Sequence, residues 1–556
     1  MKGTLTEIIN AALEEARKDG LVPAGELPAP IIELTRDRKY GDYATNVAMV
    51  LASRSAGNPR KIAEIIAKKI LDVDREENID RVETAGPGFI NLTMKGRFWE
   101  RAVKTVLQEG GDYAKGAVGL GRRIQVEFVS ANPTGPLHVG HGRGAAIGDA
   151  LANVLAAAGY EVEREYYIND AGNQIQTLGR SVFARYLELF GKSAPFPEDG
   201  YQGEYIIRIA ENLREEFGDR YLEGDREESM DEIARYAANE ILRDIRDDLE
   251  DFGVRFDVWF SESALVRSDE VSLALDELGR AGHLYREGGA VWFRSTAMDD
   301  DKDRVVVKAD GSLTYFASDI AYHRNKFSRG FDRIINIWGA DHHGYVARMK
   351  AGVMALGRNR EDLAVLLVQL VNLKRHGQPV AMSTRAGEFV TLKEVREEVG
   401  RDAARFIFLT RKADSKLDFD LDLAKEQSND NPVFYVQYAH ARICSIIRNA
   451  EQQGIPVPGV ESVDLSRLTL PEERELVRHL ASLPDVVEGA ALAMEPHRIS
   501  IFLREISTTL HNYYYHHRVL ADDRELTAAR LALMIAVRTA VAKALSLLGV
   551  SAPERM

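Results

Sequence analysis

Cysteine is almost absent from this chain: Cys444 is the single cysteine among 556 residues. One cysteine excludes an internal disulfide framework and a zinc site built from several thiolates, so we expect no structural metal. Long apolar runs are also missing, and the amphipathic segment 1–20 lacks the apolar core of a signal peptide. These absences predict a cytoplasmic chain with no membrane partner.

An excess of positive charge is missing too. The chain has 72 Lys and Arg against 86 Asp and Glu, which gives a net charge of −14. Much of that charge is local, because residues 195–250 hold 18 acidic residues against seven arginines. Residues 431–556 are nearly balanced, with 13 basic and 14 acidic residues. The total charge therefore does not exclude a polyanionic partner; it indicates which segment would avoid one.

The length indicates several domains, because 556 residues exceed the size of a single hydrophobic core. Residues 1–110 alternate helical and strand-like stretches and predict a small α+β domain. Residues 120–390 are typical of a nucleotide-binding α/β domain, with an acidic helical insertion at about 181–285. Residues 391–556 are almost wholly helical in pattern. The expected fold is therefore multidomain α/β.

The strongest signal is a strand, a turn and a helix in succession. A β-branched run at 124–129 predicts a buried strand, a Pro/Gly turn at 132–136 ends it, and a helix rich in alanine and glycine follows. His138 and His141 lie three apart at the start of that helix, so their side chains project from the same side. Free N–H groups there, and the small Gly140, would let a triphosphate approach the backbone. The alternative is two polar histidines at a frayed helix end, but the surrounding pattern favours a nucleotide site.

Two further groups could belong to the same site. Tyr315 and Asp319 are four apart, so on a helix they share a face and could hold one ligand group. A lone aspartate such as Asp319 is more often a helix cap or a surface charge. Gly339, Asp341 and His342 follow a predicted strand, where a ribose or an adenine would be bound. A metal cluster is the less favoured alternative there, because adjacent histidine side chains diverge.

A polar loop at 380–387 follows the last predicted strand of the α/β domain. Loops of this kind can close over a triphosphate, to which Ser383 would offer a hydroxyl and Arg385 a cation, with Met382 beside them. A solvated connection is the alternative.

Aromatic and basic side chains alternate in two stretches of the helical tail. They are Tyr435, Tyr438 and Arg442 in the first, and Tyr513, Tyr514 and Arg518 in the second. This pattern suits unstacked RNA bases, which stack on aromatic and arginine side chains. Core packing explains Tyr435 and Tyr438 equally well, because their neighbours are apolar. Three consecutive tyrosines followed by His-His-Arg cannot all face one core, so part of the second stretch should be exposed.

Together these motifs resemble the arginyl-tRNA synthetases of bacteria over nearly the full chain. HVGH at 138–141 is similar to the HIGH signature of class I, and YINDAGNQ (167–174), YFASDIAYH (315–323) and the stretch 419–442 also look like that family. An α/β unit that is split by a helical insertion and followed by a helical tail is the class I plan. The resemblance implies a Rossmann-type catalytic domain, an N-terminal domain that touches the tRNA elbow, and a C-terminal anticodon-binding domain.

The implied activity is ATP-dependent ligation of L-arginine to its tRNA through arginyl-adenylate, with Mg²⁺ carried on the phosphates and with activation that requires tRNA. The resemblance assigns the arginine pocket to Glu127, Asn132, Tyr315, Asp319 and His342, or Asp341 in place of the last. It assigns ATP binding to His138, Gly140, His141, Gly339, Asp341, Met382 and Ser383, and catalysis to His138, His141, Ser383 and Arg385. It assigns tRNA binding to the six tail residues named above. Two carboxylates in the plane of a guanidinium suit its fixed donors. Glu127 could instead be a strand carboxylate paired with a nearby arginine.

Nothing in the sequence indicates an oligomer, so we expect a monomer.

The chain departs from the family at its second signature, KMSK. The matching residues 381–384 read Ala-Met-Ser-Thr, so both lysines are missing. Arg385, Lys374 and Lys308 are candidates for the missing cation, and we prefer Arg385.

Two other functions are alternatives to the ligase. A small-metabolite nucleotidylyltransferase is disfavoured by the long tail, and a non-catalytic tRNA-binding paralogue by the intact histidines and carboxylates.

Overall fold

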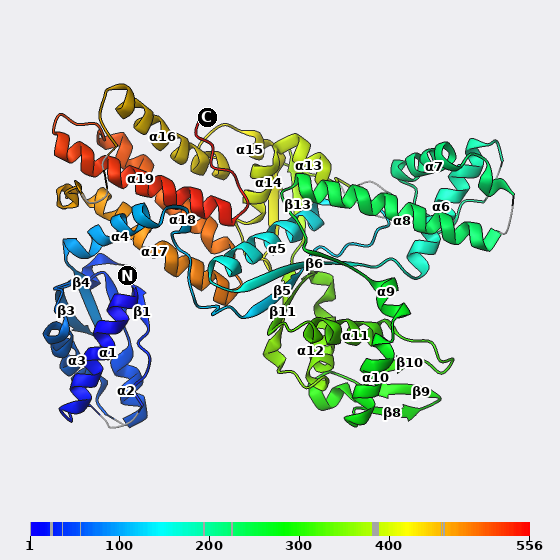
Figure 1. Ribbon diagram of the computed structural model, residues 1–556, viewed down its shortest axis with the longest axis horizontal. Helices are drawn as coiled ribbons and strands as arrows, with labels where there is room; N and C mark the ends of the chain where they lie inside the picture. The colour runs from blue at the N-terminus through cyan, green and yellow to red at the C-terminus, as the bar shows by residue number, and fades with distance from the viewer. Residues whose placement is uncertain are drawn as a thin grey trace.

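The computed structural model describes residues 2–22, 26–35, 37–55, 57–192, 195–223, 226–380, 389–457, 459 and 462–556. The N-terminal domain lies beneath one end of the helical tail, and the insertion projects at the opposite end of the molecule (Figure 1). No helix in the described part of the chain is long and apolar enough to cross a membrane.

A four-stranded antiparallel sheet packed against helices forms the N-terminal domain. The strands lie in the order β1-β2-β4-β3. Their bounds are β1 (Ile32–Leu34), β2 (Tyr43–Thr45), β3 (Ile79–Ala85) and β4 (Phe89–Met94), and the helices are α1 (Lys2–Lys18), α2 (Val47–Ser55) and α3 (Pro59–Val73). Leu5, Ile9 and Leu13 lie on one face of α1 and are buried in a core that belongs to this domain. The α+β fold expected for this region is confirmed. Helix α4 (Gly96–Glu109) then leads out of the domain and packs against the tail.

A five-stranded parallel sheet lies at the centre of the molecule, in the order β12-β11-β5-β6-β7. Its strands are β5 (Arg123–Glu127), β6 (Glu161–Ile168), β7 (Val258–Ser261), β11 (Arg333–Gly339) and β12 (Leu363–Val368). The chain runs outward from β5 to β7 and returns to β11 beside β5, so the strand order reverses between β5 and β11. Open parallel sheets bind ligands at the carboxyl ends of the strands at such a point. Helix α5 (Val139–Ala157), which follows β5, begins at this edge. The doubly wound α/β fold is confirmed.

The helical insertion is shorter than the expected 181–285. It consists of α6 (Asn173–Leu189), α7 (Glu204–Phe217) and α8 (Arg226–Asp251), and then β7 returns to the central sheet beside β6. The sequence analysis missed β7 because a strand of four residues is too short to show a recognisable alternation of apolar and polar side chains.

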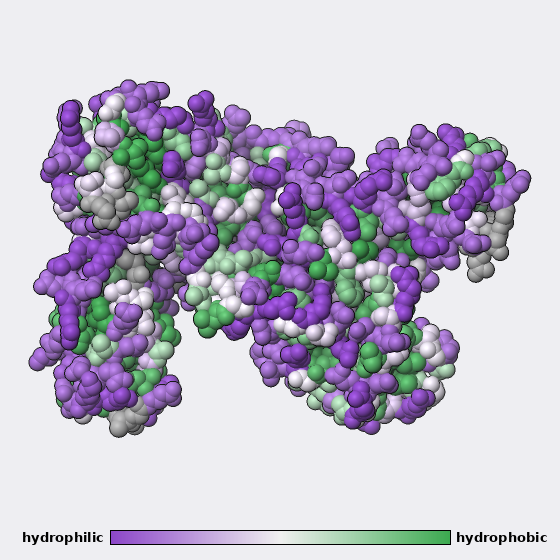
Figure 2. Space-filling view, in the orientation of Figure 1, coloured by the Kyte–Doolittle hydropathy of each residue, from purple (hydrophilic) through white to green (hydrophobic). Residues whose placement is uncertain are grey.

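Figure 2 shows hydrophilic side chains over most of the viewed face of the insertion, as its acidic composition requires.

A smaller unit follows β7. It contains α9 (Glu262–Arg267), α10 (Glu270–Arg280), α11 (Tyr315–Ser328), α12 (Val346–Ala355) and an antiparallel sheet of β8 (Leu284–Glu287), β9 (Ala290–Phe293) and β10 (Arg304–Val307). Helices α10 and α11 pack against each other within a separate apolar cluster. This unit carries Asp319 on α11 to the edge of the central sheet.

The tail is helical, with one exception. Its helices are α13 (Leu392–Val399), α14 (Arg401–Phe408), α15 (Leu421–Lys425), α16 (Pro432–Gln452), α17 (Pro471–Ala493), α18 (His497–His516) and α19 (Arg524–Leu547). The exception is β15 (Leu417–Asp420), which pairs in parallel with β13 (Val371–Arg375). Leu417 and Phe419 alternate with polar residues and are buried, so β15 is a half-buried strand.

Candidate active site

His138 occupies the N-cap position of α5 and turns its ring back onto the start of the helix. Its Nδ1 accepts hydrogen bonds from the backbone N–H groups of Gly140 (3.0 Å) and His141 (3.3 Å). The Nδ1 of His141 accepts the N–H of His138 at 3.3 Å, so the two side chains form a reciprocal capping box. The ring centroids lie 3.7 Å apart and the rings are stacked. Helix capping therefore fixes the two imidazoles as a pair.

The N–H groups at this helix start have protein partners, which corrects the expectation that they are free for a phosphate. The N–H of Gly142 donates to the carbonyl of His138 at 3.2 Å, and the N–H of Val139 donates to Val390. The next two N–H groups are those bound by the His138 ring. Because each Nδ1 accepts from the backbone, each neutral ring carries its own proton on Nε2. The groups available to a phosphate are therefore the two Nε2–H donors.

Both rings are neutral near pH 7. Burial lowers the pKa of His138, and burial together with the neighbouring His138 lowers the pKa of His141 to about 3. The pair therefore offers hydrogen-bond donors without bringing positive charge into the site.

Two glycines of this stretch leave room for protein atoms. A Cβ added at Gly140 would lie 2.9 Å from the His138 ring, and one added at Gly142 would lie 2.6 Å from Leu392. Gly140 therefore makes room for the His138 ring, and its expected role, which is to let a nucleotide approach the backbone, stays a prediction.

The backbone beside His138 pairs with the segment that follows the polar loop 380–387. The N–H of Leu392 donates to the carbonyl of Leu137 at 2.7 Å, and His138 and Thr391 form an isolated antiparallel bridge. The segment 390–392, which follows the polar loop, is therefore attached directly to the backbone at the histidine pair. Met382, Ser383 and Arg385 themselves lie outside the described residues.

A cleft of about 550 Å³ contains the histidine pair. Its lining includes Asn132, Thr134, Gly135, Pro136, His138, His141, Gln174, Tyr201, Tyr205 and Phe389. The Tyr205 hydroxyl donates to the carbonyl of Thr134 at 2.8 Å, and the Asn132 amide donates to Gln174 at 2.6 Å. Part of the wall thus comes from the insertion. The sequence interpretation missed this, because residues 198–205 carry no motif and meet the turn only through the tertiary fold.

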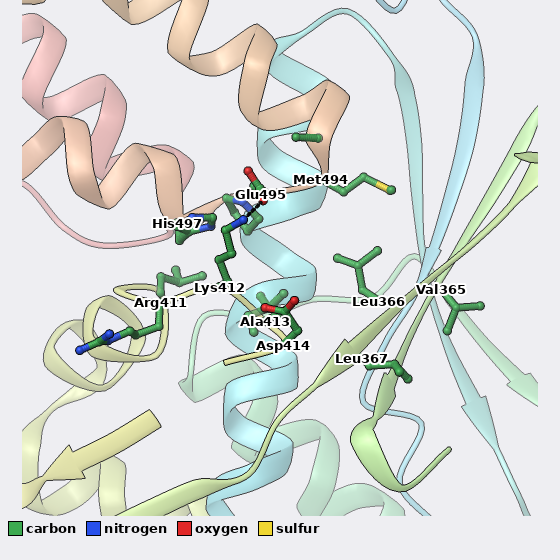
Figure 3. A pocket seen from close by; sticks show the side chains of 14 residues that line it. Val365, Leu366, Leu367, Arg411, Lys412, Ala413, Asp414, Met494, Glu495 and His497 are labelled. Carbon is green, nitrogen blue, oxygen red and sulfur yellow. Dashed lines mark ion pairs between the residues drawn. The ribbon is translucent and has the colours of Figure 1, made fainter. Parts of the chain in front are cut away.

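A second cavity, of about 320 Å³, lies between the central sheet and the tail (Figure 3). The ion pair of Lys412 and Glu495, 2.8 Å apart, lies along it, and apolar side chains of β12 form the opposite side. None of the predicted site residues lines this cavity, so the cleft with the histidine pair is the candidate active site.

Three carboxylates interact at the same edge of the sheet: Glu127 at the end of β5, Asp319 on α11 and Glu262 at the start of α9. Burial, and then the charge of Glu127, raises the pKa of Asp319 to about 6. Burial, and then the charge of Asp319, raises the pKa of Glu262 to about 7. A cation among these groups would restore their ionised forms, so the cluster is suited to binding a positive ligand. Glu262 was not foreseen, because it lies in no motif.

Two of these carboxylates have partners within the protein. The fully buried Lys326 places its Nζ 2.5 Å from Glu127, and the Tyr345 hydroxyl donates to Asp319. The alternative interpretation of Glu127, a paired strand carboxylate, is thus correct, with lysine in place of the expected arginine. Tyr345 was also missed, although it lies only three residues after His342.

Three other residues assigned to the arginine pocket or to ATP, Tyr315, Asp341 and His342, are exposed. Tyr315 is 71% exposed. The side chains of Asp341 and His342 pair with each other at 3.6 Å in the turn after Gly339, and are 81% and 60% exposed. Among the described residues, no hydrogen bond or ion pair joins Tyr315 or His342 to Asp319. The structure therefore brings together Glu127 and Asp319, but not the whole predicted set.

Two of the candidate cations lie within the described residues. Lys374 on β13 pairs with Asp418 at 2.8 Å, and Lys308 is exposed in the turn after β10. Where side chains are described, no group of three or more His, Cys, Asp or Glu could hold a metal ion.

Aromatic and basic side chains of α16 and α18 meet around His511. The Arg442 guanidinium lies 4.5 Å from the ring centroid of Tyr438 and 4.9 Å from that of Tyr514, and it bonds the His511 Nδ1 at 2.9 Å. The ring of Tyr435 lies 4.6 Å from that of His511. The two aromatic stretches of the tail thus form one cluster.

Tyr513 does not belong to this cluster, so its assignment to tRNA binding is wrong. It is fully buried, and its hydroxyl donates to Glu473. Successive side chains on a helix turn by about 100°, which directs Tyr513 inward and leaves Tyr514 41% exposed. Arg518 follows the end of α18 and is exposed.

Three family models match the chain. Residues 3–94 match the arginyl tRNA synthetase N terminal domain, residues 102–417 match the catalytic domain of class I (R) tRNA synthetases, and residues 436–556 match the DALR anticodon binding domain.

Curated relatives match along their whole length. An arginine–tRNA ligase from Syntrophotalea carbinolica is 53% identical over 556 residues, with all of both chains covered. One from Moorella thermoacetica is 50% identical, with 100% of this chain and 99% of the relative covered. Among solved structures, the arginyl-tRNA synthetase of Thermus thermophilus has a TM-score of 0.78 at 25% identity, with all of both chains covered. That of Plasmodium falciparum, at 17% identity, shares the fold with a TM-score of 0.73 over 100% of this chain and 99% of its own.

The capping geometry predicts the protonation state of the histidine pair. We expect two-bond proton–nitrogen spectra of histidine-labelled protein to show His141 as the neutral Nε2–H form from about pH 8 to about pH 5, because its pKa is far below the usual value of about 6.5. In urea-unfolded protein the same ring should titrate near 6.5. An imidazolium signal for His141 at neutral pH in the folded protein would contradict the assignment.

Proposed function

The chain belongs to the arginyl-tRNA synthetases of class I, which are arginine–tRNA ligases, and on that premise we propose how its residues divide the reaction. The arginine carboxylate attacks the α-phosphate of ATP and pyrophosphate leaves, which gives arginyl-adenylate. A hydroxyl of the 3′-terminal ribose of tRNA then attacks the activated carbonyl and AMP leaves. No covalent enzyme intermediate is needed, so catalysis consists of positioning and electrostatic stabilisation.

The histidine pair acts on the phosphate. His138 and His141 donate their Nε2–H groups to the α-phosphate as negative charge develops on it. Their capping bonds hold both rings in place before the substrate arrives, so no reorganisation is required during the reaction. Asn132, in the wall of the same cleft, and Gly140, which makes room for the His138 ring, support this arrangement.

The carboxylate cluster binds the arginine side chain. A guanidinium has five donors in a plane and is always protonated, so it matches several carboxylates better than a lysine ammonium does. Because Lys326 already pairs with Glu127, Asp319 and Glu262 are the groups that the incoming guanidinium compensates. The observation that carries the proposal is that this cluster and the neutral donor pair both lie at the carboxyl edge of one parallel sheet.

The remaining roles follow the family. ATP enters as its Mg²⁺ complex, Gly339 and Asp341 bind its ribose or adenine, and Ser383 supplies a hydroxyl to the departing pyrophosphate. Arg385, in place of the family's lysine, supplies the cation. Arginine tRNA is the partner, and its binding is required for arginine activation. The exposed part of the tail cluster, with Tyr435, Tyr438, Arg442, Tyr514 and Arg518, receives anticodon bases.

Arginine-dependent ATP–pyrophosphate exchange tests the division of roles. We expect exchange with arginine and arginine tRNA together, and none with lysine or without tRNA. Asp319→Asn should lower kcat/KM for arginine by the equivalent of about 2–5 kcal/mol, because it removes a buried charged contact. Asp269→Asn, at an exposed N-cap that makes no side-chain capping bond, is the matched control and should behave like the wild type. Wild-type kinetics in Asp319→Asn would disprove the assignment of this pocket.

Arginine binding should depend on pH. Asp319 and Glu262 have raised pKa values of about 6 and about 7, so in the arginine-free protein they take up protons as the pH falls through that range. A guanidinium favours their ionised forms, and its binding therefore releases protons and weakens as the pH falls from about 8 to about 6. Isothermal titration calorimetry in two buffers of different ionisation enthalpy measures the protons released. An affinity that is constant over this interval would show that the guanidinium binds elsewhere.

Tyr514→Ala should weaken tRNA binding by about 1–3 kcal/mol, which is the usual contribution of one base stacked on an aromatic ring. Tyr513→Phe is the control, since that neighbouring ring is buried and only its hydroxyl is lost. Filter binding at one fixed salt concentration compares the two variants, because phosphate contacts make affinity depend on salt. Equal affinities of both variants and the wild type would remove Tyr514 from the RNA interface.

A further inference from the structure

A buried arginine joins three parts of the molecule behind the active site. Arg405, on α14, has no exposed surface, and its guanidinium donates in three directions. Its Nη2 lies 2.5 Å from the Asp149 carboxylate on α5. Its Nη1 donates to the carbonyls of Phe252 (3.1 Å) and Gly253 (3.3 Å), directly after the last helix of the insertion. Its Nε donates to the carbonyl of Leu548 at 3.1 Å, directly after α19.

The Asp149 carboxylate that pairs with Arg405 lies on the helix that begins at the histidine pair. Asp149 lies on α5, which begins at His138, and α5 packs against α14, α17 and α19 (Figure 1). A second hydrogen bond connects α5 with the end of α19: the Asn153 amide on α5 donates to the carbonyl of Leu547 at 3.3 Å. The end of α19 is thus bonded to α5 directly at the Leu547 carbonyl, and through Arg405 at the Leu548 carbonyl.

The other end of α5 is also fixed by a buried arginine. Arg143, fully buried, donates to the carbonyls of Gln369 and Lys412, each at 2.8 Å. An α-helix is stiff along its length, so a displacement of α5 at Asp149 tilts the helix about its attachment at Arg143 and thereby moves the histidines at its start.

We propose that Arg405 is a positioning residue for the reaction: it sets α5, and with it His138 and His141, according to the place of Leu548, directly after α19. A guanidinium suits this role because one rigid, planar group bonds α5, the insertion and the tail at the same time. The proposal rests on the phosphate role given above to the two histidines.

Direct removal of Arg405 is a poor test, because it would break a buried ion pair and leave three carbonyls without their donor, which would destabilise the fold. Gly549 offers a better one. A Cβ at Gly549 would lie 2.1 Å from Nη2 and 2.4 Å from Cζ of Arg405, and the guanidinium cannot move aside without giving up its bonds. In Gly549→Ala, the added methyl group of the tail therefore displaces the guanidinium of Arg405.

A matched control exists in the same domain. Gly549 has a φ of +65°, so alanine there is also strained by its backbone. Gly454, after α16, has a φ of +71° and nothing within 4 Å of an added Cβ. Gly454→Ala therefore reproduces the backbone strain without the contact with Arg405.

The experiment measures arginine-dependent ATP–pyrophosphate exchange with saturating arginine tRNA, together with tRNA affinity and the thermal unfolding midpoint of each variant. For Gly549→Ala we expect kcat to fall by about tenfold or more, because small displacements of catalytic groups have effects of this size. The KM for arginine and the Kd for tRNA should stay within about twofold of wild type, since neither binding surface is touched. Gly454→Ala should match the wild type in all three values.

Each other outcome overturns the proposal. Wild-type kcat in folded Gly549→Ala, or equal losses in both glycine variants, would show that Arg405 has no positioning role. If Gly549→Ala does not fold, Asn153→Ala decides in its place: it removes the bond to Leu547, together with the Asn153 bonds to Asp149 and Arg164, and should lower kcat with KM unchanged. His138→Asn, which keeps a capping side chain but has no Nε2–H, separates the two hypotheses. Wild-type kcat in that variant would refute the phosphate role itself, whatever Gly549→Ala shows.

Discussion

The start of α5 is the constraint on which the active site depends. A helix begins with N–H groups that lack partners within the helix, and here the protein supplies them, chiefly from the two histidine rings. That arrangement stacks the rings, fixes their tautomers and keeps them neutral. It also explains why Gly140 carries no side chain, because a Cβ there would collide with the ring that caps the helix. The donors that meet the phosphate are in this way a product of the fold itself.

The two ends of the substrate meet opposite electrostatic environments. The phosphate meets neutral donors, and the guanidinium meets carboxylates whose pKa values are raised by burial and by neighbouring carboxylates. Lys326 already pairs with Glu127 within the fold. Asp319 and Glu262 are thereby left as the groups whose charge depends most on the ligand, which gives the pocket its preference for a permanent cation.

The parts that could be predicted are those encoded by local sequence. The strand, turn and helix around the histidines follow from β-branched residues, a Pro/Gly break and small residues in succession, and the structure has them almost where the pattern placed them. β7 and β15 escaped because four-residue strands give no clear period. Tyr205, Glu262 and Tyr345 escaped for another reason: their partners lie far along the chain, and only the tertiary fold brings them together. Tyr513 was wrong because a run of tyrosines does not reveal which of them faces the core.

The distribution of apolar cores indicates which parts of the molecule move together. One continuous core includes the central sheet, α5 and the tail, from Val126 to Val550. The N-terminal domain has a core of its own, and between it and α17 lie the ion pairs of Arg478 with Asp42, Arg38 with Glu475 and Lys2 with Asp485. Domain contacts made by charged groups rearrange at lower cost than a shared apolar core, because water and salt can replace them. A bound tRNA that spans both regions therefore finds the N-terminal domain adjustable and the tail fixed to the catalytic sheet. The tail can then transmit a strain to α5 because it cannot relieve that strain by swinging away.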